Sequence, residues 1–233
     1  MFVAAVPAQA FGTNCYVLAP AAGEQCVIVD PGIGIVRALD DVLAEHRLQP
    51  VAVLLTHGHL DHTFSVAPVC GARGIPAYVH PDDRELLDDP AKGFSSDMLN
   101  LFGGRLPYTA PDDVKPLGDG ETISLAGLEV TVDHAPGHTG GSVMFRVAGG
   151  AAEEGESLFS GDVLFAGSIG RTDLPGGDLT AMLRSLRDKV LTLPDATRVL
   201  PGHGPSTTIG RERAANPYLR EVTRQLAPPT KGL

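Results

Sequence analysis

The stretch Thr56-His57-Gly58-His59-Leu60-Asp61-His62 directly follows a short apolar run that predicts a buried strand. In an extended segment, side chains two positions apart project to the same side, so His57 and His59 can converge on one metal ion. If the chain turns into a helix near Asp61, then Asp61 and His62 point elsewhere and suit a second ion. The alternative, that these polar side chains only cap a strand and its loop, is disfavoured for so dense a cluster.

Three further candidate ligands lie downstream, each just after an apolar run and beside glycine. His138 lies within APGHTGGS, Asp162 ends FSGD, and His203 lies within LPGHGP. In α/β proteins the ends of strands collect functional groups, although each of these residues alone would be an ordinary turn residue. Together with the first cluster they give five imidazoles and two carboxylates, a donor set that suits zinc, iron or manganese.

Short apolar runs alternate with a few helical patterns, which is typical of a layered α/β fold. The expected strands cover residues 2–6, 16–18, 26–30, 51–56, 77–80, 129–134, 142–147, 157–160 and 198–200. The expected helices are Ile35–Arg47, Leu179–Leu191 with Asp178 as its N-cap, and Arg211–Leu226 before two prolines. Since no repeat or linker marks a boundary, residues 1–233 are expected to form a single domain.

The segment from Arg84 to Asp119 has a weaker pattern, which predicts a long connection with little regular structure. Two interpretations of its apolar residues stay open. They either pack a surface segment onto the core, which we favour slightly, or cover a functional site. The residues concerned are Phe94, Leu99, Leu101, Phe102 and Tyr108.

Composition narrows the function classes. Lys and Arg total 18 against 28 Asp and Glu, and the formal net charge of −10 disfavours a nucleic-acid partner. The 3 cysteines form no CxxC pair, which suits a reducing compartment. There is no positively charged N-terminal region of a signal peptide and no apolar stretch long enough to span a membrane. We therefore expect a cytoplasmic protein without a membrane partner, and the sequence does not specify an oligomeric state.

The ordered set of motifs resembles the metallo-β-lactamase superfamily, and within it the short bacterial glyoxalase-II-like thioester hydrolases. The resemblance runs from VDPG through THGHLDH, APGHTGGS and FSGD to GSIGRTDLPGGD and LPGHGPSTTIGRER, which is nearly the whole chain. It implies a four-layer αββα sandwich with the site at one edge of the two sheets.

The resemblance also implies two divalent metal ions, with zinc expected and iron or manganese as alternatives. By this resemblance His57, His59 and His138 hold one ion, Asp61, His62 and His203 hold the other, Asp162 bridges the two, and the buried Asp30 supports the ligand loop.

Such a centre implies the hydrolysis of a small-molecule thioester, as in hydroxyacylglutathione hydrolases. A hydroxide that bridges two ions can attack the thioester carbon while one ion polarises the carbonyl oxygen. The resemblance gives Asp61 a second, catalytic role in orienting this hydroxide. Only about thirty residues follow His203, so we expect no counterpart of the helical region that completes the glutathione site of full-length glyoxalase II, and the thiol carrier and acyl group stay open. Arg171 is a candidate for binding a carboxylate of the carrier, with an ion pair to Asp173 as an equally weighted structural alternative.

Other functions fit part of the pattern. His57, His138 and Asp162 form a two-histidine, one-carboxylate triad, which a mononuclear iron persulfide dioxygenase of this fold would use. A lactone or ester hydrolase would share the hydroxide mechanism, whereas a nuclease or a non-catalytic metal-binding module is disfavoured. Of the remaining histidines, His46 and His80 are expected to be structural or solvated, and His134 either supports the site or is structural.

Overall fold

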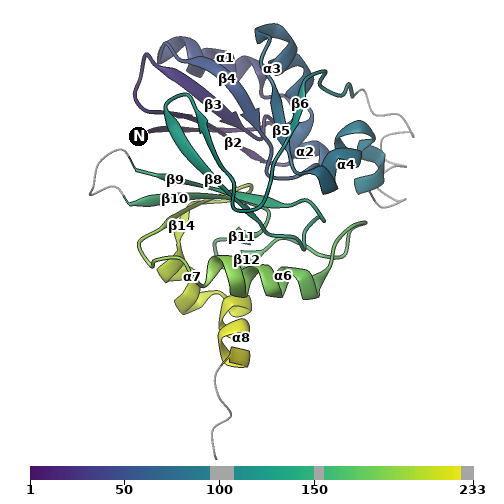
Figure 1. Ribbon diagram of the computed structural model, residues 1–233, viewed down its shortest axis with the longest axis vertical. Coiled ribbons are helices and arrows are strands. Elements are labelled where there is room, and N and C mark those ends of the chain that lie inside the picture. The colour runs from purple at the N-terminus through teal and green to yellow at the C-terminus, as the bar shows by residue number, and fades with distance from the viewer. Residues whose placement is uncertain (95–107, 150–154, 227–233) are drawn as a thin grey trace, which may run out of the picture.

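The computed structural model describes residues 1–94, 108–149 and 155–226, and two mixed sheets stacked face to face form its centre (Figure 1). The first sheet has the strand order β1 (Phe2–Pro7), β2 (Asn14–Ala19), β3 (Gln25–Val29), β4 (Gln49–Leu54), β5 (Ala77–Val79) and β6 (Val114–Pro116). The second sheet has the order β14 (Thr207–Thr208), β13 (Arg198–Pro201), β10 (Glu156–Gly161), β9 (Val143–Ala148), β8 (Leu128–His134) and β7 (Thr122–Leu125). A small hairpin pairs β11 (Leu164–Phe165) with β12 (Ser168–Ile169).

Helices cover the outer face of each sheet. On the first sheet and its edge lie α1 (Val36–Glu45), α2 (Leu60–Thr63), α3 (Val66–Arg73), α4 (Arg84–Asp88) and the short 3-10 helices η1 (Pro81–Asp83) and η2 (Pro90–Gly93). The second sheet is covered by α6 (Leu179–Ser185), the π-helical turn η3 (Leu186–Val190), α7 (Ile209–Ala215) and α8 (Pro217–Leu226). Figure 1 shows α1 and α3 above the first sheet and α6 and α7 below the second, so the predicted αββα sandwich is confirmed.

The alternation of side chains along the strands explains the four layers. In β2, Tyr16 and Leu18 join a cluster that also holds Phe145 of β9, so these residues fill the space between the sheets. The intervening Cys15 and Val17 belong to a different cluster, together with Leu39 of α1. A third cluster packs the outer face of the second sheet against α6, η3 and α8.

The long connection contains more regular structure than predicted, because it includes α4, η2 and the edge strand β6. Its apolar residues behave in both of the expected ways. Tyr108 packs against the core of the first sheet, whereas Phe94 lines the cavity described below. Leu99, Leu101 and Phe102 lie outside the described residues.

The prediction of a single C-terminal helix over Arg211–Leu226 is wrong, because this region forms the two helices α7 and α8. The helix is interrupted at Asn216, which has extended backbone angles (φ −68°, ψ 122°). Pro217 causes the break, since proline disfavours the helical conformation of the residue before it and lacks an N–H group. The predicted N-cap of α6 is confirmed, because the Asp178 side chain accepts a hydrogen bond from the Ala181 N–H. None of the helices in the described ranges has the length and apolar character required to cross a membrane.

Candidate metal centre

The loop after β4 brings the first cluster of polar side chains to the edge of the sandwich. His59 has extended backbone angles and directly precedes α2, so the predicted helical turn at Asp61 is confirmed. This change from extended to helical backbone separates the side chains into two sets. His57 and His59 precede the helix, whereas Asp61 and His62 belong to its first turn.

The first set combines with His138, which follows β8. The ligand-type atoms of His57, His59 and His138 all lie within 4.8 Å of one another, and all three side chains are buried. The Nδ1 atom of His59 faces the Nε2 atom of His138 at 2.9 Å. We call these three residues the histidine group.

The second set combines with His203, which follows β13. The His203 Nε2 atom lies 3.2 Å from the Nε2 atom of His62 and 3.2 Å from the Oδ2 atom of Asp61. We call Asp61, His62 and His203 the carboxylate group.

Asp162, at the end of β10, lies between the two groups. Its Oδ2 atom is 3.5 Å from the Nε2 atom of His138 and 3.6 Å from that of His203, and its Oδ1 atom is 3.4 Å from the Nε2 atom of His62. The structure therefore brings together all seven residues that the sequence analysis proposed as ligands. Their role as ligands stays a prediction.

Backbone and side-chain acceptors orient the imidazoles from behind. His138 donates its Nδ1–H to the carbonyl of Arg171 (2.7 Å), and His203 donates its Nδ1–H to the carbonyl of Phe11 (3.2 Å). These bonds leave the Nε2 lone pairs directed into the site, an arrangement commonly seen in metal-binding histidines.

Asp30 lies directly beneath the ligand loop and is buried. Its carboxylate accepts hydrogen bonds from the backbone N–H of Thr56 (2.8 Å), the Thr56 hydroxyl (2.6 Å) and His62 Nδ1 (2.9 Å). The Thr56 oxygen in turn accepts from His57 Nδ1 at 3.1 Å. Asp30 thus contacts the ligand loop, and its supporting role stays a prediction.

The two groups have opposite electrostatic environments. Burial lowers the pKa of His57 well below its usual value and lowers that of His59 to about 3, with the neighbouring imidazoles adding to the effect. Burial acts in the same direction on His62, but the nearby carboxylates outweigh it and raise its pKa well above the usual value. The pKa of His203 is also raised, because its hydrogen bond to Asp61 and the charge of Asp162 overcome its partial burial.

Several buried polar atoms in the site lack a hydrogen-bond partner, and they show whether the site suits metal ions. The buried Nε2 atoms of His57 and His59 and the Oδ1 atom of Asp162 have no hydrogen-bond partner among the described residues. Buried polar atoms are normally satisfied, and the facing Nε2 atoms of His62 and His203, 3.2 Å apart, need either a shared proton or a metal ion between them. Nitrogen and carboxylate donors in this number suit two divalent ions, so the residues fit a binuclear centre.

A cavity of about 450 Å³ opens onto this centre. Ligand candidates from both groups form its floor, and its walls are mostly apolar. The wall residues are Phe11, Ile33, Leu60, Pro90, Phe94, Phe165, Ile169 and Leu174. The sequence analysis did not identify this wall, except for the suggestion that Phe94 covers a site, because its members come from separate segments with no shared pattern.

Arg171 lines the same cavity. Its guanidinium makes a two-pronged ion pair with Asp173, with both bonds at 2.8 Å, and both side chains are exposed. The structure therefore contains the ion pair that was the alternative interpretation. Arg171 has a second contact through its backbone, because its carbonyl orients His138. Its role in substrate binding stays a prediction.

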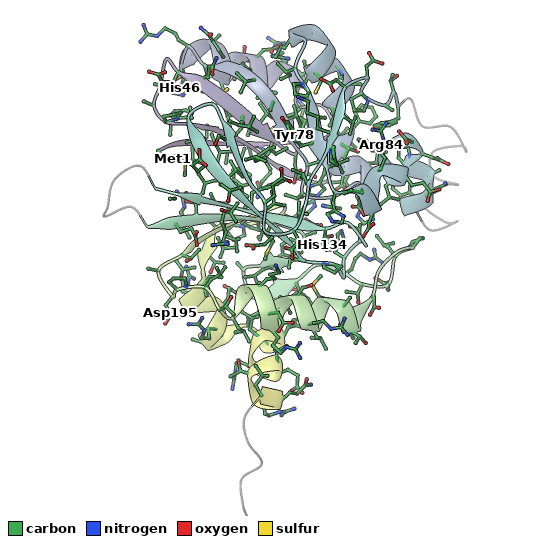
Figure 2. All side chains as sticks on the ribbon, viewed as in Figure 1. Met1, His46, Tyr78, Arg84, His134 and Asp195 are labelled. Carbon is green, nitrogen blue, oxygen red and sulfur yellow. The ribbon has the colours of Figure 1, made fainter. Side chains whose placement is uncertain are left out.

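The remaining histidines lie outside the cluster. Figure 2 shows His46 at the end of the molecule near α1, away from His134, and its ring packs against Phe2. The rings of His80 and His134 stack on each other, and His134 Nε2 donates to the carbonyl of Gly140.

The buried Glu212 was also missed by the sequence analysis. Its carboxylate accepts hydrogen bonds from the Gly167 N–H (2.7 Å) and the Thr207 hydroxyl (2.6 Å). Gly167 forms the turn between β11 and β12, the hairpin that contributes Phe165 and Ile169 to the cavity wall. The only signal was the position of Glu212 in the TTIGRER motif, which does not reveal a contact 45 residues away.

The four-layer sandwich and the paired ligand groups at its edge define a metalloprotein of the αββα class. The chain belongs to the metallo-beta-lactamase superfamily, whose family model matches residues 8–203.

Known relatives match the chain over nearly its full length. A Mycobacterium tuberculosis protein, Rv2581c, is 48% identical over 225 residues, which cover 96% of this chain and 100% of the relative. The hydroxyacylglutathione hydrolase GloC of Haemophilus influenzae is 34% identical over 223 residues, covering 94% of this chain and 98% of GloC.

Two solved structures are also similar over most of their length. The BLEG-1 B3 metallo-beta-lactamase is 40% identical, with a TM-score of 0.80 and coverage of 94% of this chain and 99% of that protein. TTHA1623, solved in a di-iron-bound form, is 39% identical, with a TM-score of 0.74 and coverage of 93% and 100%.

Proposed function

We propose that this protein is a metal-dependent thioester hydrolase of the hydroxyacylglutathione hydrolase type. The observation that carries the proposal is the joining of the two ligand groups by Asp162 on the floor of an open cavity. The similarity to GloC, which is named as a hydroxyacylglutathione hydrolase, supports this choice of substrate class.

The ligand candidates divide between two ions in this proposal. The histidine group holds one ion, the carboxylate group holds the other, and Asp162 contributes to both. When bound, such ions polarise a carbonyl and lower the pKa of water. Zinc is our choice, and the di-iron form of TTHA1623 makes iron the first alternative.

Asp61 has a second role beyond binding metal. It lines the cavity, and the Thr13 hydroxyl donates a hydrogen bond to its Oδ2 atom at 3.1 Å. Burial opposes ionisation of this carboxyl, but the charges of His62 and His203 and the hydrogen bond from His203 prevail, so its pKa lies below the usual range. An ionised, fixed carboxylate at this position accepts a hydrogen bond from the attacking water and orients it.

The cavity walls favour a substrate with an apolar portion next to the thioester. Arg171 is the candidate for binding a carboxylate of the thiol carrier, since a guanidinium can hold a carboxylate through two charge-assisted hydrogen bonds. The proposed partner is thus a small molecule, and the net charge of −10 disfavours nucleic acid. The three cysteines are free and buried, which supports the proposal of a cytoplasmic protein.

The experiment combines metal analysis with two activity assays on one preparation. We expect close to two ions per chain and cleavage of a hydroxyacylglutathione thioester. Loss of cleavage in Asp61→Asn, with His46→Ala unchanged, would tie the activity to this site.

Other outcomes would overturn the proposal. One iron per chain with oxygen consumption on a thiol persulfide would identify the dioxygenase. Cleavage of lactones but not thioesters would identify the other hydrolase class, and bound metal without turnover of any of these compounds would indicate a non-catalytic module.

A further inference from the structure

Asp83, the last residue of η1, is a buried carboxylate that the proposed metal centre does not use. We propose that Asp83 is a positioning residue that joins the two loops of the histidine group and sets the affinity of that group for its ion. The inference rests on the proposed metal centre but not on the identity of the substrate.

The hydrogen bonds of Asp83 connect segments that are far apart in the sequence. Its Oδ2 atom accepts from the backbone N–H of Gly58 (2.7 Å) and from the Thr139 hydroxyl (2.7 Å), and its Oδ1 atom accepts from the Gly141 N–H (2.7 Å). Gly58 lies between His57 and His59, and Thr139 follows His138. One side chain therefore contacts both loops that supply the histidine group.

The two glycines allow the loops to approach Asp83 closely. A Cβ atom on Gly141 would lie 2.6 Å from the Asp83 nitrogen, and one on Gly58 would lie 2.9 Å from the Asp83 carbonyl oxygen. Any other residue at either position would displace η1 from the loop. The loops are thus packed on the backbone of Asp83 as well as bonded to its side chain.

The contacts of Asp83 require a carboxylate rather than an amide. Two of the three partners are backbone N–H groups, which can only donate. The third, the Thr139 hydroxyl, can accept from the Ser142 hydroxyl at 2.8 Å while it donates to Asp83. In Asp83→Asn, the amide N–H₂ would face an N–H donor in either orientation, and a buried donor would lose its partner.

A second contact connects the residue before η1 to the loop that carries His138. The ring of His80, which precedes η1, stacks on the ring of His134 with centroids 3.9 Å apart and an angle of 9°, and His134 donates to the Gly140 carbonyl. Together with Asp82, these histidines resemble a small metal site. Because an imidazole lone pair lies in the ring plane, two stacked parallel rings cannot both point at one ion. The pair therefore acts as a packing contact.

The carboxylate group depends on a different support. His62 is oriented by Asp30, and His203 by the carbonyl of Phe11. The hydrogen bonds of Asp83 described above go only to the loops of the histidine group. Loss of the Asp83 carboxylate should therefore weaken one ion and leave the other nearly unchanged.

The test measures zinc affinity in variants that retain only one of the two ligand groups. Zinc binding is measured by competition with a chromophoric chelator in a His203→Ala background, which keeps the histidine group, and in a His59→Ala background, which keeps the carboxylate group. Adding Asp83→Asn should lower the affinity about 10- to 100-fold in the first background and change it less than about threefold in the second. The matched control is Asp82→Asn, since the neighbouring Asp82 is exposed and should leave both affinities unchanged.

A second variant keeps the test decisive if Asp83→Asn does not fold. Thr139→Val removes one hydrogen bond to Asp83 but keeps the carboxylate, and it should weaken the same ion by a smaller factor. Unchanged zinc affinity in the His203→Ala background, or equal losses in both backgrounds, would overturn the positioning role. If the parent protein still binds two ions in that case, the proposed metal centre is retained and only the positioning role of Asp83 fails. If the parent binds none, the centre and this inference both fail.

Discussion

Each ligand group takes two of its three residues from the seven-residue stretch Thr56–His62, yet the surroundings of the two groups shift their imidazole pKa values in opposite directions. In the histidine group, burial and the neighbouring imidazoles lower the pKa values of His57 and His59. In the carboxylate group, three nearby carboxylates raise the pKa of His62 despite complete burial. The difference shows that the ligand type alone does not determine how a site competes for protons.

This contrast has a direct consequence for metal binding. The histidine group presents His57 and His59 as neutral imidazoles at neutral pH, so an ion has no protons to displace from these two residues. In the carboxylate group, protons on His62 and His203 compete with the ion. Asp162 links the groups, because it lies within 3.6 Å of imidazole nitrogens in both.

The largest expected effect comes from removing this link. Asp162→Ala should reduce the metal content of both groups and lower kcat/KM by more than the roughly 10- to 100-fold cost of losing an outer partner of a metal ligand. His203→Ala should mainly empty the carboxylate group and leave close to one ion per chain. Elemental analysis and thioester cleavage of the two variants would measure the difference.

His46→Ala is the control for these variants, because His46 packs on Phe2 and belongs to neither ligand group, so it should change neither metal content nor cleavage. Equal metal loss in Asp162→Ala and His203→Ala would contradict the bridging position of Asp162.

A smaller effect should separate the groups by pH. Between pH 7.5 and 6.0, each displaced proton reduces the apparent metal affinity by up to about tenfold per pH unit. The raised pKa values of His62 and His203 keep these protons bound as the pH falls, whereas the lowered values of His57 and His59 do not. Zinc affinity should therefore fall more steeply in His59→Ala, which retains the carboxylate group, than in His203→Ala.

Affinity titrations at several pH values would check this slope. Parallel slopes for the two variants would mean that the carboxylates do not hold protons on His62 and His203 in solution, and the proposed contrast would be lost.

The sequence predicted the seven clustered side chains because each of them is marked locally. Four lie in THGHLDH, and the other three follow apolar strands beside glycine. The layered α/β class was predictable from short apolar runs that alternate with helical patterns, whereas the four-layer αββα sandwich was implied by the resemblance of the motifs to the superfamily.

The supporting contacts were not predictable in the same way. Asp83 accepts from Gly141, 58 residues away, and Glu212 from Gly167, 45 residues away. No local pattern marks such pairs, because the contacts exist only after the sheets have packed. The break at Asn216 was different, since Pro217 marks it in the sequence and should have ended the predicted helix there.

The smallest predicted effect concerns Arg171 at the rim of the cavity. Its ion pair with Asp173 is exposed and screened by solvent, so Arg171→Ala should leave the melting temperature and metal content nearly unchanged. If the guanidinium binds a carboxylate of the thiol carrier, the variant should raise KM for a glutathione thioester about fivefold, the equivalent of about 1 kcal/mol. A small thioester without a carboxylate should be cleaved as before.

Asp173→Ala is the matched control, because it breaks the same ion pair but leaves the guanidinium free to bind substrate. It should keep or lower KM for the glutathione thioester. If the pair is structural instead, both variants should lose stability to the same extent and cleave both substrates more slowly. Melting temperatures and KM values for the two substrates therefore separate the roles, because only carrier binding makes the two variants differ.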